Sequence, residues 1–146
     1  MKTVFTLLLS CFSLALLAQS PVGFWRTIDD ETGKPKSIVE IYEKDGKLFG
    51  KIAQLTPEAG KDRNRVCISC EDDRKNQKIE GMEIIRDMKK DGKEWEDGTI
   101  LDPKNGKVYD CELWVDEDNP DLLNVRGYIA FFFRTQQWIR TKNPAQ

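Results

Sequence analysis

Residues 107–115, with the sequence KVYDCELWV, alternate between apolar and polar side chains over most of their length. One face of this stretch, read as an extended chain, collects its apolar members: Tyr109, Cys111, Leu113 and Val115. The opposite face carries Asp110 and Glu112. This period of two is typical of a β-strand with one buried face. No window of the chain sustains apolar spacing at i, i+3 and i+4, so the sequence predicts an all-β protein.

Similar runs lie on both sides of this strand and are separated by turn signals. They cover residues 23–28, 37–44, 47–55, 82–89, 94–101, 122–130 and 131–141. Asp45-Gly46 and Asp91-Gly92 predict tight hairpins, because glycine accepts the positive φ that such turns need, and Asp97-Gly98 predicts a bulge. A short helix is the alternative for residues 82–89. About eight strands joined in sequence predict a single up-and-down antiparallel β-barrel, in which closure removes exposed edges.

The first 18 residues have the composition of a cleaved secretory signal. Lys2 supplies a positive charge, an apolar run follows from Val4 to Ala18, and the chain turns polar at Gln19. A charged start, a moderate apolar run and a small residue at its end are typical of such signals. We expect cleavage after Ala18. This leaves a single domain over residues 19–146, in the periplasm or secreted, with no transmembrane segment.

Two alternatives concern the same end of the chain. Leu8-Leu9-Ser10-Cys11 has the form of a lipobox, which would make Cys11 a lipid-modified first residue. The apolar run continues past Cys11 as far as Ala18, whereas a lipoprotein normally turns polar after its cysteine, so a soluble product is favoured. Cleavage after Ser20 is the second alternative.

The charge balance and the absence of histidine exclude several classes of protein. The chain has 23 basic and 25 acidic residues and no histidine, and loss of Lys2 changes the net charge from −2 to −3. Such a mixed surface argues against nucleic-acid binding, which needs clustered Lys and Arg. Without an imidazole, Ser-His-Asp and Cys-His catalysis and the usual His-rich metal sites are excluded. We therefore predict a protein that is not an enzyme and has no cofactor and no metal.

Three cysteines follow the signal: Cys67, Cys70 and Cys111. The spacing Cys67-x-x-Cys70 is found in redox pairs, but those begin a helix in a βαβ unit, and this pair lies in a polar segment. In an oxidising compartment a structural disulfide is the better interpretation. It would join Cys67 to Cys70, or would tie their segment to Cys111, with the third thiol reduced in the core. A metal site with a neighbouring aspartate is a further alternative, although zinc sites usually pair two CxxC motifs.

Two pairs of polar residues near the C-terminus are the candidate ligand site. Arg126 and Tyr128 share one strand face, and Arg134 and Gln136 share a face of the next strand. If the strands pair with these faces inward, they form a cationic pocket for a carboxylate or phosphate head group. In the alternative arrangement both arginines face solvent and apolar residues fill the core: Leu123, Val125, Ile129, Phe131, Phe133 and Ile139.

Four groups of segments stand in a recognisable order. They are GFWRTID (23–29), CISC (67–70) with GMEI (81–84), ILDP (100–103) with NGKVY (105–109), and LNVRGY (123–128) with RTQQW (134–138). Together they resemble the DUF2147 family of small exported bacterial proteins. The resemblance implies a lipocalin-like barrel of unknown function, and it transfers no catalytic residue.

A second resemblance concerns the two ends of the barrel sequence. Gly23-Phe24-Trp25 near the start and Arg140 near the end are similar to the lipocalin and calycin pattern. That pattern implies a tryptophan in the barrel floor with a guanidinium packed across it, held by cation–π attraction.

Three functions are compatible with these observations. The leading hypothesis is a barrel that binds a small apolar or amphipathic ligand, since eight strands can enclose one small molecule. The second is a ligand-free structural or interaction module of the cell envelope, with an interior filled by side chains. The third is a thiol redox or metal protein centred on Cys67 and Cys70. A lined cavity favours the first over the second.

Overall fold

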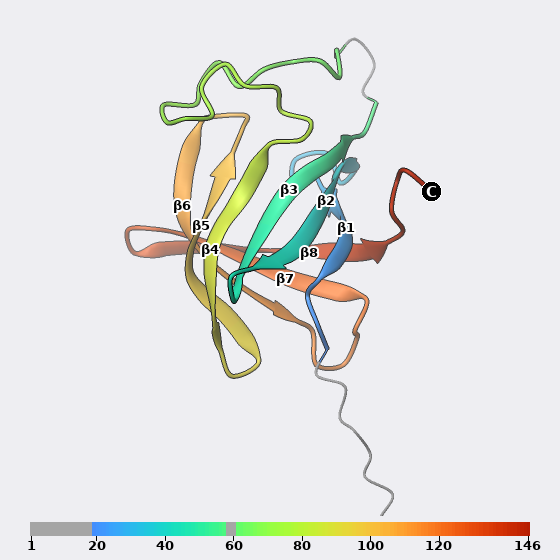
Figure 1. Cartoon of the computed structure of the whole chain (residues 1–146), viewed down its shortest axis with the longest axis vertical. Coiled ribbons are helices and arrows are strands. Elements are labelled where there is room, and N and C mark those ends of the chain that lie inside the picture. The colour runs from blue at the N-terminus through green and yellow to red at the C-terminus, as the bar shows by residue number, and fades with distance from the viewer. Residues whose placement is uncertain (1–18, 58–60) are drawn as a thin grey trace, which may run out of the picture.

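The computed structural model describes residues 19–57 and 61–146, and there the chain forms a closed antiparallel barrel (Figure 1). Its strands are β1 (Gly23–Ile28), β2 (Pro35–Lys44), β3 (Lys47–Leu55), β4 (Glu83–Asp91), β5 (Glu94–Asp102), β6 (Lys107–Val115), β7 (Leu122–Ile129) and β8 (Phe132–Thr141). Each strand pairs with its neighbour in sequence, and β8 pairs with β1 to close the barrel. The predicted up-and-down barrel is thereby confirmed.

The predicted signal peptide and the absence of a membrane span concern the N-terminal end of the chain and its helices. The signal peptide and the alternative lipid-modified Cys11 fall on residues 1–18, outside the described part of the chain. Among the described residues, no helix is long and apolar enough to cross a membrane.

The short-helix alternative for residues 82–89 is wrong, because Glu83–Asp91 is strand β4. A β-bulge explains why the apolar residues of this strand do not alternate strictly. Leu48 pairs with Met88 and Gly50 with Ile85, so three residues of β4 span two of β3, and Asp87 adopts a φ of 60°. The extra residue changes the alternation of the strand. Ile85 and Met88 are therefore both buried although they lie three positions apart, which would place them on opposite faces of a regular strand.

The core fills the barrel with large side chains. The largest fully buried ones include Trp25, Ile41, Leu48, Ile85, Met88, Leu113 and Leu123. Trp95 and Trp138 are buried with them. Small eight-stranded barrels have an interior that side chains of this size fill.

The two ends of the barrel carry different connections. The chain enters β1 at one end, which we call the floor. The loop end carries the connections 29–34, 56–82, 103–106 and 130–131.

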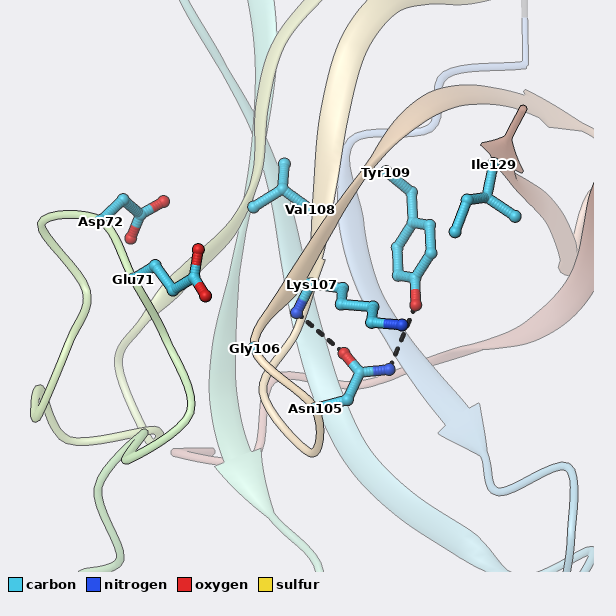
Figure 2. A pocket seen from close by; sticks show the side chains of 8 residues that line it. All are labelled: Glu71, Asp72, Asn105, Gly106, Lys107, Val108, Tyr109 and Ile129. Carbon is cyan, nitrogen blue, oxygen red and sulfur yellow. Dashed lines mark hydrogen bonds between the residues drawn. The ribbon is translucent and has the colours of Figure 1, made fainter.

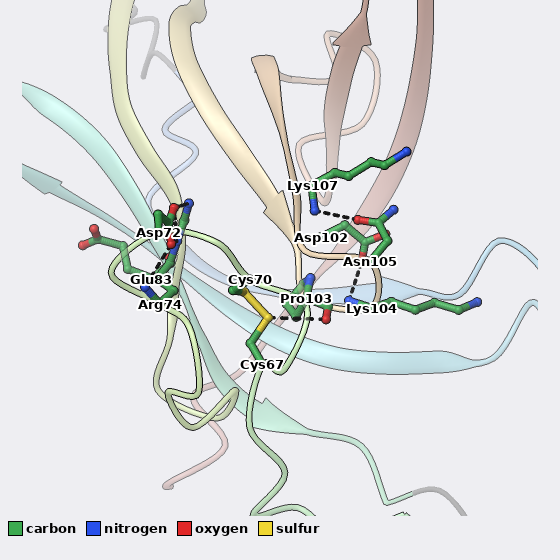
Figure 3. The surroundings of a disulfide bond; sticks show 10 residues. All are labelled: Cys67, Cys70, Asp72, Arg74, Glu83, Asp102, Pro103, Lys104, Asn105 and Lys107. Carbon is green, nitrogen blue, oxygen red and sulfur yellow. Dashed lines mark hydrogen bonds and ion pairs between the residues drawn. A yellow bond between two sulfur atoms is a disulfide. The ribbon is translucent and has the colours of Figure 1, made fainter.

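The long segment 56–82 is tied by a disulfide between Cys67 and Cys70 (Figure 3). This decides the pairing that the sequence left open, and Cys111 is a buried free thiol among the described residues. Cys67 Sγ lies 3.6 Å from the Pro103 carbonyl oxygen in the β5–β6 turn. At Gly106 in the same turn, an added Cβ would lie 1.8 Å from the Ser69 carbonyl oxygen. The disulfide ring is therefore packed directly on this turn.

A buried guanidinium fastens the same segment to β4. Arg74 donates to both carboxylate oxygens of Asp72 and, through Nη1, to the Glu83 carbonyl oxygen at 3.1 Å. Because Arg74 is buried, these acceptors replace the water that its charge has lost. The segment holds a fixed position against the strand ends at the loop end of the barrel.

Candidate functional site

The floor of the barrel is built from Gly23, Trp25 and Arg140. The Arg140 guanidinium lies over the Trp25 indole, 4.1 Å from the ring centroid, and Trp25 Nε1 donates to the Pro21 carbonyl oxygen at 2.8 Å. Arg140 also donates to the carbonyl oxygens of Ser20 and Pro120. Gly23 has a φ of 137°, and a Cβ there would lie 3.3 Å from Arg140 Nη1. These contacts close the floor of the barrel.

The two residue pairs predicted to share one pocket lie on opposite faces of the barrel wall. Directly paired residues of neighbouring strands have their side chains on the same face of the sheet. Gly127 pairs with Arg134, whereas Arg126 pairs with Thr135. The inner face of β7 contains buried Val125, and its partner Gln136 lies on that face together with Arg134. Arg126 and Tyr128 therefore face outward. The predicted four-residue pocket does not form, because β7 and β8 pair one residue away from the register it required.

The outward pair belongs to a packed cluster on the wall. The Arg126 guanidinium lies between the rings of Trp114 and Phe133, 4.9 and 4.7 Å from their centroids, and its Nε donates to the Thr135 hydroxyl. The Tyr128 hydroxyl donates to Glu112, and this hydrogen bond raises the pKa of Tyr128. Both residues therefore bond to partners within the wall, and the cluster stabilises β6–β8.

The inward pair lies at the rim of the loop end. Arg134 Nη2 is 2.6 Å from Asp30 Oδ2, and Gln136 donates to the same carboxylate. Gln136 also accepts a hydrogen bond from Trp138 Nε1 at 3.1 Å. The β1–β2 loop is thus joined to β8. Whether any of Arg126, Tyr128, Arg134 and Gln136 binds a ligand stays a prediction.

A hollow of about 540 Å³ lies at the loop end, between the β5–β6 turn, the disulfide segment and the end of β7 (Figure 2). Its lining residues are Glu71, Asp72, Asn105, Gly106, Lys107, Val108, Tyr109 and Ile129. Tyr109 continues the inner face of the barrel, because Ile85, Ile100 and Tyr109 are direct cross-strand partners. In Figure 2 the ring of Tyr109 stands beside Ile129, and Asn105 donates to its hydroxyl at 3.1 Å.

Charged side chains of both signs line this hollow: Glu71, Asp72 and Lys107. Arg74 holds the Asp72 carboxylate by hydrogen bonds that lower the pKa of Asp72 to about 2. No ion pair among the described residues involves Lys107 or Glu71, and both side chains are exposed. The hollow therefore combines an apolar surface with one neutralised carboxylate, one exposed carboxylate and one exposed ammonium group. Sequence reasoning missed it, although Lys107 and Tyr109 share the alternating face of 107–115.

A second hollow of about 560 Å³ lies on the outer wall over β5 and β6. Acidic groups dominate its lining, including Glu96, Asp97, Asp110 and Glu112. A hydrogen bond with Glu112, and then burial and the neighbouring negative charges, raise the pKa of nearby Glu94. Among the described residues no group of three or more His, Cys, Asp or Glu could hold a metal ion. We assign no function to this hollow.

Comparison with known proteins identifies the family. The model of DUF2147, described as an uncharacterized protein conserved in bacteria, matches residues 23–140. The chain belongs to the DUF2147 family. The match extends from Gly23 in the barrel floor to Arg140, which packs on the same floor. Both ends of the family match therefore meet in one structural feature, and the hollow at the loop end lies within the DUF2147 region.

A solved structure shares the fold of this DUF2147 chain. It is protein HP1028 from the human pathogen Helicobacter pylori, described as belonging to the lipocalin family. The two chains are 17% identical, the match covers 86% of each, and the TM-score is 0.71. The likeness shows that the DUF2147 chain has a lipocalin-like barrel. No curated protein matches the chain in sequence.

Proposed function

We propose that this protein is a non-enzymatic binding protein that acts outside the cytoplasm and holds a small amphipathic molecule at the loop end of its barrel. The observation that carries the proposal is the hollow in which Tyr109, Val108 and Ile129 adjoin Asn105 and Lys107. Its volume of about 540 Å³ falls within the range of small-molecule sites, and it joins apolar walls to a few convergent polar groups.

The chemistry of the hollow indicates the parts of the ligand. The apolar portion would lie against Tyr109 and Ile129, whose exposed surfaces lose contact with water on binding. The Lys107 ammonium and the Asn105 amide are hydrogen-bond donors, so the head group would carry acceptor oxygens, as a carboxylate or phosphate does. The deeper interior is filled by Trp25, Trp95 and other large side chains, so the ligand would sit at the rim.

Three observations support a location outside the cytoplasm. Residues 1–18 have the composition of a secretory signal. Cys67 and Cys70 form a disulfide, which persists in oxidising compartments. The family is described as bacterial. The lipocalin-like fold is compatible with ligand binding, and a chain with no histidine has no imidazole for Ser-His-Asp or Cys-His catalysis.

The test is a fluorescence titration of the mature protein with a dansyl-labelled undecanoic acid. We expect saturable binding that Lys107→Gln weakens about three- to tenfold, because a hydrogen bond to a charged head group is lost. Val108→Ser should weaken it as well, through the apolar wall. The matched controls are Lys89→Gln in the outer hollow and Ile68→Ser, an exposed apolar residue that does not line the site.

Native mass spectrometry of the protein purified from its own compartment then identifies the natural ligand. An additional mass that is lost on denaturation, and lost in Lys107→Gln, would support the proposal. A bare protein mass together with no saturable probe binding would overturn it. The filled interior favours the second candidate function in that case, a ligand-free module of the cell envelope.

A further inference from the structure

The turn between β7 and β8 exposes apolar side chains that a soluble barrel normally buries. The exposed fractions are 51% for Ile129, 99% for Phe131, 75% for Phe132 and 63% for Phe133. The alternative in which Ile129, Phe131, Phe133 and Ile139 fill the core is wrong for these four residues, because all of them are exposed. In Figure 1 the turn projects to the left past β4, β5 and β6. Contiguous exposed apolar groups on a soluble protein indicate an interaction site.

These side chains surround the tip of the hairpin on every side. Phe132 pairs with Ile129 on one face of the hairpin, and Phe133 pairs with Tyr128 on the other. Phe131 occupies the turn itself, next to Ala130, which has a φ of 50°. A docking surface for the flat face of another protein would concentrate apolar groups on one side. A tip that is apolar all round suits a medium that is apolar all round, which is the interior of a lipid bilayer.

The charge of the hairpin fits an anionic lipid surface. Residues 122–141 contain Arg126, Arg134 and Arg140 but no Asp or Glu. Arg140 lies in the floor, and Arg126 is paired with Glu112, but the Arg134 side chain is 67% exposed although it pairs with Asp30. Arg134 follows Phe133 directly, and the Arg126 guanidinium lies 4.7 Å from the Phe133 ring centroid. If the tip enters a bilayer, the exposed Arg134 reaches the level of the head groups, where basic residues are attracted to anionic lipids.

We propose that the tip of the β7–β8 hairpin, residues 129–133, docks the protein on an anionic lipid bilayer by inserting its exposed phenylalanine and isoleucine side chains. The proposal is independent of ligand binding, since Phe131, Phe132 and Phe133 do not line the hollow. Ile129 belongs to both surfaces. Docking through the tip would bring the hollow close to the lipid.

The experiment is flotation of the mature protein with two kinds of vesicle. One contains phosphatidylglycerol and phosphatidylethanolamine in equal amounts, and the other contains phosphatidylcholine alone. We expect flotation with the first, weaker flotation with the second, and a decrease with rising salt. Phe131→Ser should lower the partition coefficient about tenfold, because one exposed phenyl ring no longer leaves water. Arg134→Gln should lower it about fivefold on the anionic vesicles only.

Phe131→Ser is preferred to changes at Phe133, since Phe133 packs against Tyr128 and Arg126 and its loss could perturb the fold. Ile68→Ser is the matched control, because Ile68 is 75% exposed but lies in the disulfide segment. Equal loss of flotation in Phe131→Ser and Ile68→Ser would overturn the proposal. Absence of flotation would also overturn it, as would a concentration-dependent dimer of the free protein that Phe131→Ser abolishes while flotation is unchanged.

Discussion

The guanidinium of Arg140 on the last strand lies 4.1 Å from the ring centroid of Trp25 on the first strand, and the two residues are also direct backbone partners. This contact therefore joins the ends of the barrel sequence where the sheet closes. The same guanidinium donates to the carbonyl oxygens of Ser20 and Pro120, so it ties the incoming chain and the β6–β7 loop to the floor.

We expect Arg140→Gln to lower the free energy of unfolding by about 2 kcal/mol, because it removes one cation–π contact and three hydrogen bonds. Urea unfolding followed by tryptophan fluorescence measures this. Arg26→Gln is the control, because Arg26 follows Trp25 on β1 and its side chain is exposed. This substitution should change the free energy of unfolding by about 0.5 kcal/mol or less. Equal effects of the two substitutions would contradict a special role for Arg140.

Gly106→Ala tests the packing of the disulfide ring on the β5–β6 turn. The added methyl group would lie 1.8 Å from the Ser69 carbonyl oxygen, and Gly106 has a φ of 74°. We expect the free energy of unfolding to fall by about 3 kcal/mol, or segment 56–82 to detach from the turn and to be cleaved faster by proteases. Gly92→Ala is the matched control, since Gly92 has a φ of 59° but nothing within 4 Å. Gly92→Ala should lower the free energy of unfolding by about 1 kcal/mol, from backbone strain alone.

The disulfide itself should stabilise the protein by about 2 kcal/mol, the loop-closure value for a ring this short. We expect Cys67→Ser with Cys70→Ser to lower the urea midpoint and to leave barrel circular dichroism and probe binding in place. Reductant should lower the midpoint of the parent protein and leave that of the double variant unchanged. Loss of all binding activity in the double variant would instead point to a thiol function.

Asp72 should contribute to the acid sensitivity of the protein. Its pKa is lowered from 3.8 to about 2 by hydrogen bonds from Arg74, so its contribution to stability is present above pH 4 and is lost as the pH falls to about 2. We expect Asp72→Asn to cost about 2 kcal/mol at pH 7, because Arg74 is left buried without its anion. The variant should then lose less stability than the parent between pH 4 and pH 2. Asp118→Asn in the β6–β7 loop is the control, and a parallel pH dependence in Asp72→Asn and the parent would contradict the prediction.

Cys111 should be inert in the folded protein. Burial, and then the neighbouring Glu112, raise the pKa of the Cys111 thiol to about 12. The folded state therefore retains this proton where the unfolded state loses it, so stability should fall as the pH rises from about 9 towards 12. We expect iodoacetamide to modify Cys111 at pH 8 only after unfolding in urea, as followed by intact mass. Rapid modification without denaturant would show that the thiol is accessible.

The sequence by itself determined the strand order, the turns and the two ends of the barrel. Alternation in residues 107–115 and the Asp-Gly turns are local signals, since a strand with one buried face and a tight hairpin impose their period and their φ angles on a few neighbouring residues. Glu83–Asp91 is a strand, as predicted for residues 82–89, but the sequence left a short helix open there as an alternative. A bulge there depends on the partner strand β3, which the local sequence does not contain.

Only the tertiary structure decided which face of each strand points inward and which residues meet. A shift of one residue between β7 and β8 separates Arg126 and Tyr128 from Arg134 and Gln136, and no local signal specifies that register. The triplet Phe131–Phe133 has the composition of a core strand, yet the β7–β8 hairpin extends beyond the strands on both sides of it. β6 pairs with β7 only as far as Tyr128, and β1 pairs with β8 only from Ile139 onward, so the rings of the triplet are exposed. The hollow at the loop end joins Glu71, Lys107 and Ile129 from three separate segments. The pairing of β6 with β7 and the packing of the disulfide segment on the β5–β6 turn bring them together.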